Sequence, residues 1–88
     1  MTMYRLTDIT RDGKTRTDGR YPLRIGSLVE IVDMCVGWRL NLSYVKDSDG
    51  NEKSGFLSTS QVIKIDSAPS LDVITVTTLN SIYTLTKA

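Results

Sequence analysis

Turn-forming residues divide this 88-residue chain into segments of about the length of a β-strand. Between these turns, no window of eleven or more residues has apolar residues at the i, i+3, i+4, i+7 spacing of an amphipathic helix. Val, Ile, Thr and Tyr, which favour strands, are frequent in the second half. The sequence therefore predicts an all-β fold with at most a single turn of helix. The turn groups lie at residues 11–13 (RDG), 17–22 (TDGRYP), 46–53 (KDSDGNEK), 66–70 (DSAPS) and 79–81 (LNS).

Three segments in the first half have strand patterns. Residues 3–10 alternate weakly, residues 27–36 are almost continuously apolar, and residues 38–45 alternate cleanly. The second of these suits a central strand that contains one bend or bulge. In the third, the side chains predicted to point into the core are Trp38, Leu40, Leu42 and Tyr44.

The segment 55–65 (GFLSTSQVIKI) begins and ends with apolar residues but is polar between Ser58 and Gln61. We expect this polar step to interrupt the strand as a single 3₁₀ turn. Phe56, which precedes it, is predicted to lie in the core, as is Tyr83 near the end of the chain.

The stretch "TLNSIYTLT" (78–86) predicts the turn of a C-terminal hairpin. With a two-residue loop at Asn80 and Ser81, opposed residues have numbers that sum to 161, so Val76 faces Leu85. Asn tolerates the left-handed conformation of such a loop, whereas Ser is a poorer choice than Gly, and a three-residue loop is the alternative. The predicted inward face carries Ile74, Val76, Thr78, Tyr83 and Leu85, and the predicted solvated face carries Thr75, Thr77, Thr84 and Thr86.

Length and composition fit one domain over residues 1–88, with a barrel core at 1–66, a long basic loop at 11–22 and the hairpin at 71–87. A domain of this size is expected to have a free energy of unfolding of about 4 to 13 kcal/mol. Cys35 is the only cysteine, so no intrachain disulfide forms, and its apolar neighbours predict burial. The start of the chain has no apolar run typical of a signal peptide, and no stretch approaches a membrane span, so we expect a cytoplasmic protein.

Charge is distributed unevenly although the net charge is only +1. Residues 1–24 have a net charge of +3, and the remainder has −2. This predicts a locally basic face. The charged residues of the first segment are Arg5, Arg11, Lys14, Arg16, Arg20 and Arg24 against Asp8, Asp12 and Asp18.

The middle of the chain resembles an SH3-type small barrel. The order "IGSLVEIVD", "GWRLNLSYV", a polar loop and "SGFLSTSQVIKI" is similar to the SH3 succession of strands over about residues 25–65. The resemblance implies a five-stranded barrel, which the C-terminal hairpin would complete or extend. Trp38 occupies the place of the SH3 groove tryptophan, so the resemblance leaves open that it is exposed at the start of its strand and not in the core. Ser58 and Gln61, however, stand in "STSQV" where that groove needs Pro and Tyr. The resemblance therefore implies the fold and not polyproline binding.

A second resemblance covers residues 54–86. The pattern "TS-x-V" followed by "V-x-T-x-N-S-x-Y" is similar to short uncharacterised proteins of bacteria and their phages, and it implies no function. It leaves open the hypothesis that four polar residues meet in space. They would either bond to one another as a structural clasp or point into a shared cleft. These four are Thr59, Ser60, Asn80 and Ser81.

The residues predict a non-enzymatic binding module that needs no cofactor or metal. The chain has no histidine, and Cys35 has no evident activating partner. The acidic loop "DSDGNE" is only superficially similar to a calcium site, because an EF-hand needs twelve residues and a final Glu. An enzyme is the least favoured class.

Two binding hypotheses remain open. The first is a protein-interaction module, and the second is a small barrel that binds nucleic acid through the basic segment 11–24. Pairing of the chain with itself, through an open edge of the C-terminal hairpin, is a further hypothesis. The candidate binding residues are Arg11, Lys14, Arg16, Arg20, Tyr21 and Trp38.

Overall fold

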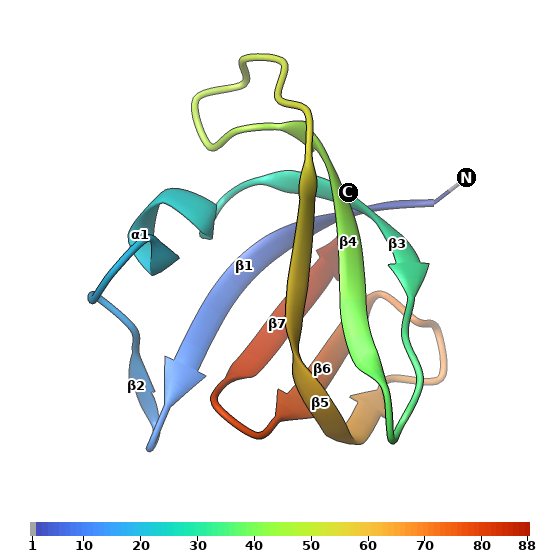
Figure 1. Cartoon of the computed structure of the whole chain (residues 1–88). Helices are drawn as coiled ribbons and strands as arrows, with labels where there is room; N and C mark the ends of the chain where they lie inside the picture. The colour runs from blue at the N-terminus through green and yellow to red at the C-terminus, as the bar shows by residue number, and fades with distance from the viewer. Residues whose placement is uncertain (1) are drawn as a thin grey trace.

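The computed structural model describes residues 2–88, most of which lie in antiparallel strands (Figure 1). One four-residue helix is present in this range, so the prediction of an all-β fold with little helix is confirmed, although no helical turn was expected at this place. The elements are β1 (Met3–Arg11), β2 (Lys14–Thr15), α1 (Tyr21–Arg24), β3 (Leu28–Asp33), β4 (Arg39–Lys46), β5 (Phe56–Ser67), β6 (Val73–Thr78) and β7 (Ile82–Lys87).

Six strands form a closed barrel in chain order, and β2 lies outside it. Each barrel strand pairs with the next one in the order β1, β3, β4, β5, β6 and β7. The last strand, β7, then pairs with β1 and closes the barrel. The C-terminal hairpin therefore completes the barrel. Both of its strands are hydrogen-bonded on both sides, β6 to β5 and β7 to β1, so the open hairpin edge on which the self-pairing hypothesis depended does not exist.

The barrel interior is filled by one side chain in every two along each strand, as strand geometry requires. Leu40 and Leu42 of β4 are fully buried, as predicted, whereas Tyr44 is only half-buried. All five residues of the predicted inward face of the hairpin are buried. The apolar core comprises Tyr4, Leu6, Ile9, Val29, Leu40, Leu42, Leu57, Val62, Ile74, Val76, Tyr83 and Leu85.

A bulge in β1 explains the weak alternation of the first strand. The register against β7 shifts between Leu6 and Asp8, so the next buried residue after Leu6 is Ile9. Such shifts bend a strand and help a barrel to close. β3, which is shorter than the predicted strand at 27–36, and β5 contain similar shifts.

The predicted register of the C-terminal hairpin is wrong by two residues. Val76 faces Tyr83, and Ile74 faces Leu85, so opposed residues have numbers that sum to 159. Because side chains alternate with a period of two, this shift leaves every residue on its predicted face. Four residues (78–81) connect the paired positions Thr77 and Ile82 in place of the predicted two.

Thr78 closes this longer turn. Its N–H and its hydroxyl both donate to the carbonyl oxygen of Ser81 at 2.8 Å, and the Ser81 N–H donates to the Thr78 hydroxyl at 3.1 Å. Neither Asn80 nor Ser81 has a positive φ, so the turn has no need of glycine. The two-residue loop with positive φ at both positions lies instead at Asp12 and Gly13, between β1 and β2.

The predicted 3₁₀ turn at 58–61 is wrong, because β5 runs without interruption through these residues. Thr59 points inward and is buried. Its hydroxyl accepts a hydrogen bond from the N–H of Leu40 at 3.1 Å, next to a register shift in β4, and donates to the carbonyl oxygen of Ser60 at 2.8 Å. A bonded hydroxyl can lie in a barrel interior, so the polar residue does not end the strand.

The predictions of burial for Cys35 and Phe56 are also wrong, and Trp38, for which exposure remained an alternative to the core, is exposed. Cys35 is exposed in the connection between β3 and β4. Trp38 has 63% of its surface exposed, because it precedes β4 in this connection. Phe56 is 72% exposed, because Leu57 beside it points inward and adjacent side chains of a strand face opposite ways.

Candidate binding surfaces

The candidate binding residues of the basic segment do not form one site. Arg11 and Lys14 are exposed and face each other across the β1–β2 hairpin, with Asp12 in its turn. Arg20 lies elsewhere, against α1 and the start of β5. Trp38 lines a different depression from all of these residues. The surface that combines the basic segment with Trp38, expected from the sequence, is thus divided among separate places.

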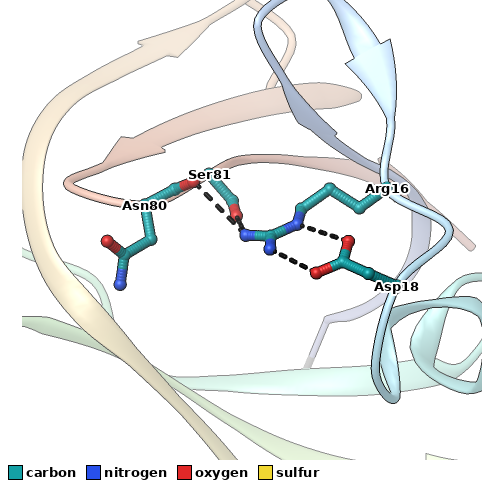
Figure 2. Close-up of polar contacts among 4 residues, drawn as sticks. All are labelled: Arg16, Asp18, Asn80 and Ser81. Atoms are coloured by element: carbon teal, nitrogen blue, oxygen red, sulfur yellow. Dashed lines mark hydrogen bonds and ion pairs between the residues drawn. The ribbon is translucent and has the colours of Figure 1, made fainter.

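Arg16 is held inside the structure rather than presented to a partner (Figure 2). Its guanidinium donates two hydrogen bonds to the carboxylate of Asp18, at 2.7 and 3.1 Å, and one to the hydroxyl of Ser81 at 2.9 Å. It also lies over the ring of Tyr21 at 4.0 Å. Only 12% of the side chain is exposed. Arg16 therefore ties the segment before α1 to the β6–β7 turn.

The four polar residues that could have formed a clasp or a cleft take separate partners. The Asn80 N–H donates to the hydroxyl of Ser60 at 3.3 Å, which is one contact of the clasp type between β5 and the adjoining β6–β7 turn. Ser81 bonds to Arg16, and Thr59 bonds within the β4–β5 pair. The side-chain amide of Asn80 points away from Arg16 (Figure 2). Thr59 and Ser60 line one depression, and Asn80 and Ser81 line another, so no cleft contains all four.

Tyr83, which lies in the core near Arg16, provides a test of this region at high pH. Burial, with a smaller contribution from Tyr21, raises the pKa of Tyr83 to about 12 from an ordinary value of 10.0. The folded state therefore keeps its proton where the unfolded state loses it, and stability present below pH 10 is lost as the pH rises toward 12. We expect chemical denaturation to report a loss on the order of 1 to 2 kcal/mol over this range.

The matched control for this titration is Tyr83→Phe, which has no phenol proton at this position. Its stability should fall less steeply between pH 10 and 12, although other tyrosines and lysines still titrate. Parallel stability curves for the two proteins would contradict the assignment to Tyr83.

A second group of cations lies where the end of α1 packs against the β4–β5 loop, and it adjoins Arg16 because Arg24 shares the ring of Tyr21 with it. Here α1 and β5 border an open depression of about 410 Å³, which we call the basic–aromatic depression. The aliphatic and aromatic residues at its rim are strongly exposed, Leu23 at 68% and Phe56 at 72%. Its lining residues are Arg20, Leu23, Arg24, Tyr44, Lys53, Phe56 and Leu57.

Local sequence explains why these elements come together. Pro22 lies in the first turn of α1, where its missing N–H costs no helical hydrogen bond. Gly26 follows α1 with a φ of +93°, and a Cβ there would lie 2.9 Å from the Cβ of Ser48 in the β4–β5 loop. Glycine therefore lets the loop pack closely against the end of α1. Gly55, also with positive φ, then directs the chain into β5 at Phe56.

Aromatic rings position two of the cations. The ammonium of Lys53 lies 4.1 Å from the centre of the Tyr44 ring, and the guanidinium of Arg24 lies 5.3 Å from that of Tyr21. Cation–π contacts at such sites contribute about 0.5 to 1 kcal/mol. Burial raises the pKa of Tyr44 above its ordinary value of 10.0, so its phenol keeps its proton further into the alkaline range.

No carboxylate lines this depression. In residues 2–88 the ion pairs within 4.0 Å are Arg16–Asp18 and Lys64–Asp66, so the three cations of the depression have no such partner. The carboxylate of Asp47 in the nearby loop is already hydrogen-bonded, because it accepts hydrogen bonds from the N–H groups of Asn51 and Asp49. These bonds lower the pKa of Asp47.

The other surface lies at the β3–β4 connection, the opposite end of β4 from the β4–β5 loop. Backbone hydrogen bonds join residues 37 and 38 to Val62, and Leu79 to Gln61. These adjoining segments carry four exposed apolar side chains, which we call the apolar end. They are Val36, Trp38, Ile63 and Leu79.

A polar depression of about 600 Å³ adjoins Trp38. Its wall is fixed by hydrogen bonds: the Asn41 amide donates to Asp33 at 3.3 Å and accepts from the Ser58 hydroxyl, and the Gln61 amide donates to the carbonyl oxygen of Gly37 at 3.3 Å. Trp38 thus stands beside a surface whose polar groups already have defined positions.

Sequence reasoning missed most of the basic–aromatic depression. Arg24 was counted in the charge of the basic segment, but Lys53 and Tyr44 were not considered as partners, and Phe56 was predicted to be buried. One available signal was the pair Phe56–Leu57, because two adjacent residues of a strand cannot both face the core. The approach of Lys53 to α1 has no signal in the sequence, because it depends on how the β4–β5 loop folds.

Among residues 2–88, no group of three or more His, Cys, Asp or Glu side chains lies close enough to hold a metal ion. The helix in this range is too short and too polar to cross a membrane. A comparison of the chain with known protein families, with curated proteins and with solved structures found no match.

Proposed function

We propose that this chain is a non-enzymatic protein-interaction module that binds its partner through the apolar end. The observation that carries the proposal is the exposure of Trp38, at 63%, among three further exposed apolar side chains on adjoining segments. An exposed tryptophan with apolar neighbours is typical of the centre of a protein interface, where burial of the ring supplies much of the binding energy.

The depression beside Trp38 supports the same function. Protein interfaces combine an apolar centre with a polar rim that makes hydrogen bonds. Arg39, Ser58 and Gln61 would form such a rim next to the indole ring. The partner surface that fits this arrangement is an apolar pocket large enough for an indole, bordered by polar groups.

Trp38→Ala is the direct test of this proposal. Loss of a central tryptophan typically costs 2 kcal/mol or more of binding free energy, so the affinity for the partner should fall about 30-fold or more. The fold should persist, because Trp38 is mostly outside the core. The partner can be captured by placing a photo-crosslinking amino acid at position 38 in the native cell, and its affinity is then measured with purified proteins.

The control places the same crosslinker at Leu71, an exposed apolar residue in the connection between β5 and β6. Adducts specific to position 38, with a partner whose binding Trp38→Ala weakens, are expected. Equal adducts at both positions, or equal affinity of the Trp38→Ala variant, would refute the apolar end as the interface. Trp38 is the only tryptophan, so a blue shift of its fluorescence on binding reports its burial directly.

A further inference from the structure

The basic–aromatic depression combines two features that the proposed protein interface does not use. Arg20, Arg24 and Lys53 contribute three positive charges to one open surface, and no carboxylate lines it. Phe56 exposes 72% of its surface at the same place. We infer that this depression binds single-stranded nucleic acid, with phosphates at the three cations and a base stacked on Phe56.

The charges favour a polyanion. None of the three cations is in an ion pair within 4.0 Å, so no such pair has to break when a ligand binds. Lys53 is the most compensated of the three, because Asp47 attracts it at longer range and Glu30 and Glu52 line the adjoining depression on its other side. Arg24 and Lys53 are also held near tyrosine rings, so less side-chain freedom is lost on binding than for free surface lysines. The excess of positive charge is local, because the net charge of the whole chain is only +1.

The exposed ring distinguishes a nucleic acid from other polyanions. Aromatic side chains beside a basic groove bind unpaired bases by stacking, which contributes about 1 to 3 kcal/mol per base. Leu23, also exposed, adds apolar surface next to the ring. An acidic peptide would be attracted by the same charges but would gain less from one flat ring than a base does.

The ring also selects a single strand over a duplex. In a duplex the bases are stacked on each other, so none is free to cover Phe56, and only the phosphate contacts would remain. The surface presents one helical turn, α1, and no longer element that could enter a groove.

The test uses fluorescence anisotropy of the full chain with a labelled 12-nucleotide single strand of mixed sequence, at several salt concentrations. Arg20→Gln with Lys53→Gln should weaken binding at least tenfold at low salt. It should also reduce the slope of log affinity against log salt by about 1.4, for two lost phosphate contacts. The matched control is Lys14→Gln with Arg39→Gln, which removes the same charge elsewhere and should change affinity less than threefold.

Phe56→Ala tests the stacking. It should weaken binding at least fivefold with an unchanged salt slope, and Phe56→Trp should restore it. Phe56 is mostly outside the core, so circular dichroism should show both variants folded. Trp38→Ala should bind the single strand normally, which separates this inference from the proposed protein interface.

Three results with the unmodified chain would overturn the inference: no binding of the single strand at low salt, equal binding of a 12-residue polyglutamate, or equal binding of a duplex of the same length. The second would assign the depression to an acidic protein partner. The third would leave only phosphate contacts, with no role for Phe56. A loss of affinity as large in the Lys14/Arg39 control would also overturn it, because binding would then follow net charge alone.

Discussion

Replacing Leu85 with alanine is expected to lower the free energy of unfolding by about 2 to 5 kcal/mol. Leu85 is fully buried on β7, where it faces Leu6 of β1 on one side and Ile74 of β6 on the other. The lost methyl groups leave a cavity at the seam that closes the barrel, and the hydrogen-bonded strands on both sides limit its collapse. Against a total stability of about 4 to 13 kcal/mol, much of the protein could unfold at 37 °C. Urea denaturation followed by circular dichroism measures the change.

Leu79→Ala is the matched control, because it makes the same change in the same hairpin. Leu79 is 64% exposed in the β6–β7 turn and should change stability by less than about 0.5 kcal/mol. If the two variants lost similar stability, the burial of Leu85 between β1 and β6 would not be a major source of the stability of the barrel. Leu79→Ala also leaves the basic–aromatic depression unchanged.

The hairpin illustrates how much of the fold was predictable from the sequence. Alternation assigned Val76, Thr78, Tyr83 and Leu85 to the core correctly, because the face of a residue depends only on parity along its strand. The register itself was not predictable, since a shift of two residues preserves every face. Thr78 decides it through its own hydrogen bonds to Ser81, which turn composition does not reveal.

Exposed aromatic residues were harder to predict. Trp38 and Phe56 have the hydrophobicity of core residues, and alternation placed both inward, although the SH3 resemblance left exposure of Trp38 open. Their positions follow instead from where strands begin: Trp38 lies just before β4, and Phe56 starts β5 with its neighbour Leu57 already inside. Prediction of all-β structure tolerates errors of this kind at strand ends, but prediction of a binding surface does not.

The basic segment shows the same limit for charge. Its composition predicted a positive face, but Arg16 forms an ion pair within the fold, and Arg11 and Lys14 lie on the β1–β2 hairpin. Arg20 lines a depression together with Lys53, which comes from a loop distant in the sequence. Contacts between residues far apart in the chain decide which cations are free. These contacts depend on barrel closure, which no local pattern encodes.

Arg16→Ala is expected to lower the free energy of unfolding by about 1.5 to 3 kcal/mol. The variant loses a charged hydrogen bond to Ser81, which is buried with 3% exposure, and the contact with the Tyr21 ring. It also leaves the Ser81 hydroxyl without its charged partner in a site that water reaches poorly. Lys14→Ala, an exposed change in the adjacent β2, should alter stability by less than about 0.5 kcal/mol.

A double-mutant cycle with Ser81→Ala assigns the effect to this contact. Alanine removes only the hydroxyl and fits the negative φ of Ser81, so Ser81→Ala would be nearly neutral if the hydroxyl had no structural role. Because Ser81 holds Arg16, we expect destabilisation instead, and a coupling energy between the two changes of about 1 kcal/mol or more. Additive effects would mean that the guanidinium stabilises the fold without the serine.

The ion pair adds a pH dependence to the same contact. The hydrogen bonds from Arg16 lower the pKa of Asp18 below its ordinary value of 3.8. The stability that Asp18 contributes is therefore complete above that value and is lost as the pH falls through its folded-state pKa. In Arg16→Ala this part of the acid sensitivity should disappear, which urea denaturation at pH 2 to 5 would detect as a shallower loss than in the parent chain. Equal acid sensitivity in both proteins would show that Asp18 does not depend on Arg16, and the tie between the segment before α1 and the β6–β7 turn would then rest on the serine contact alone.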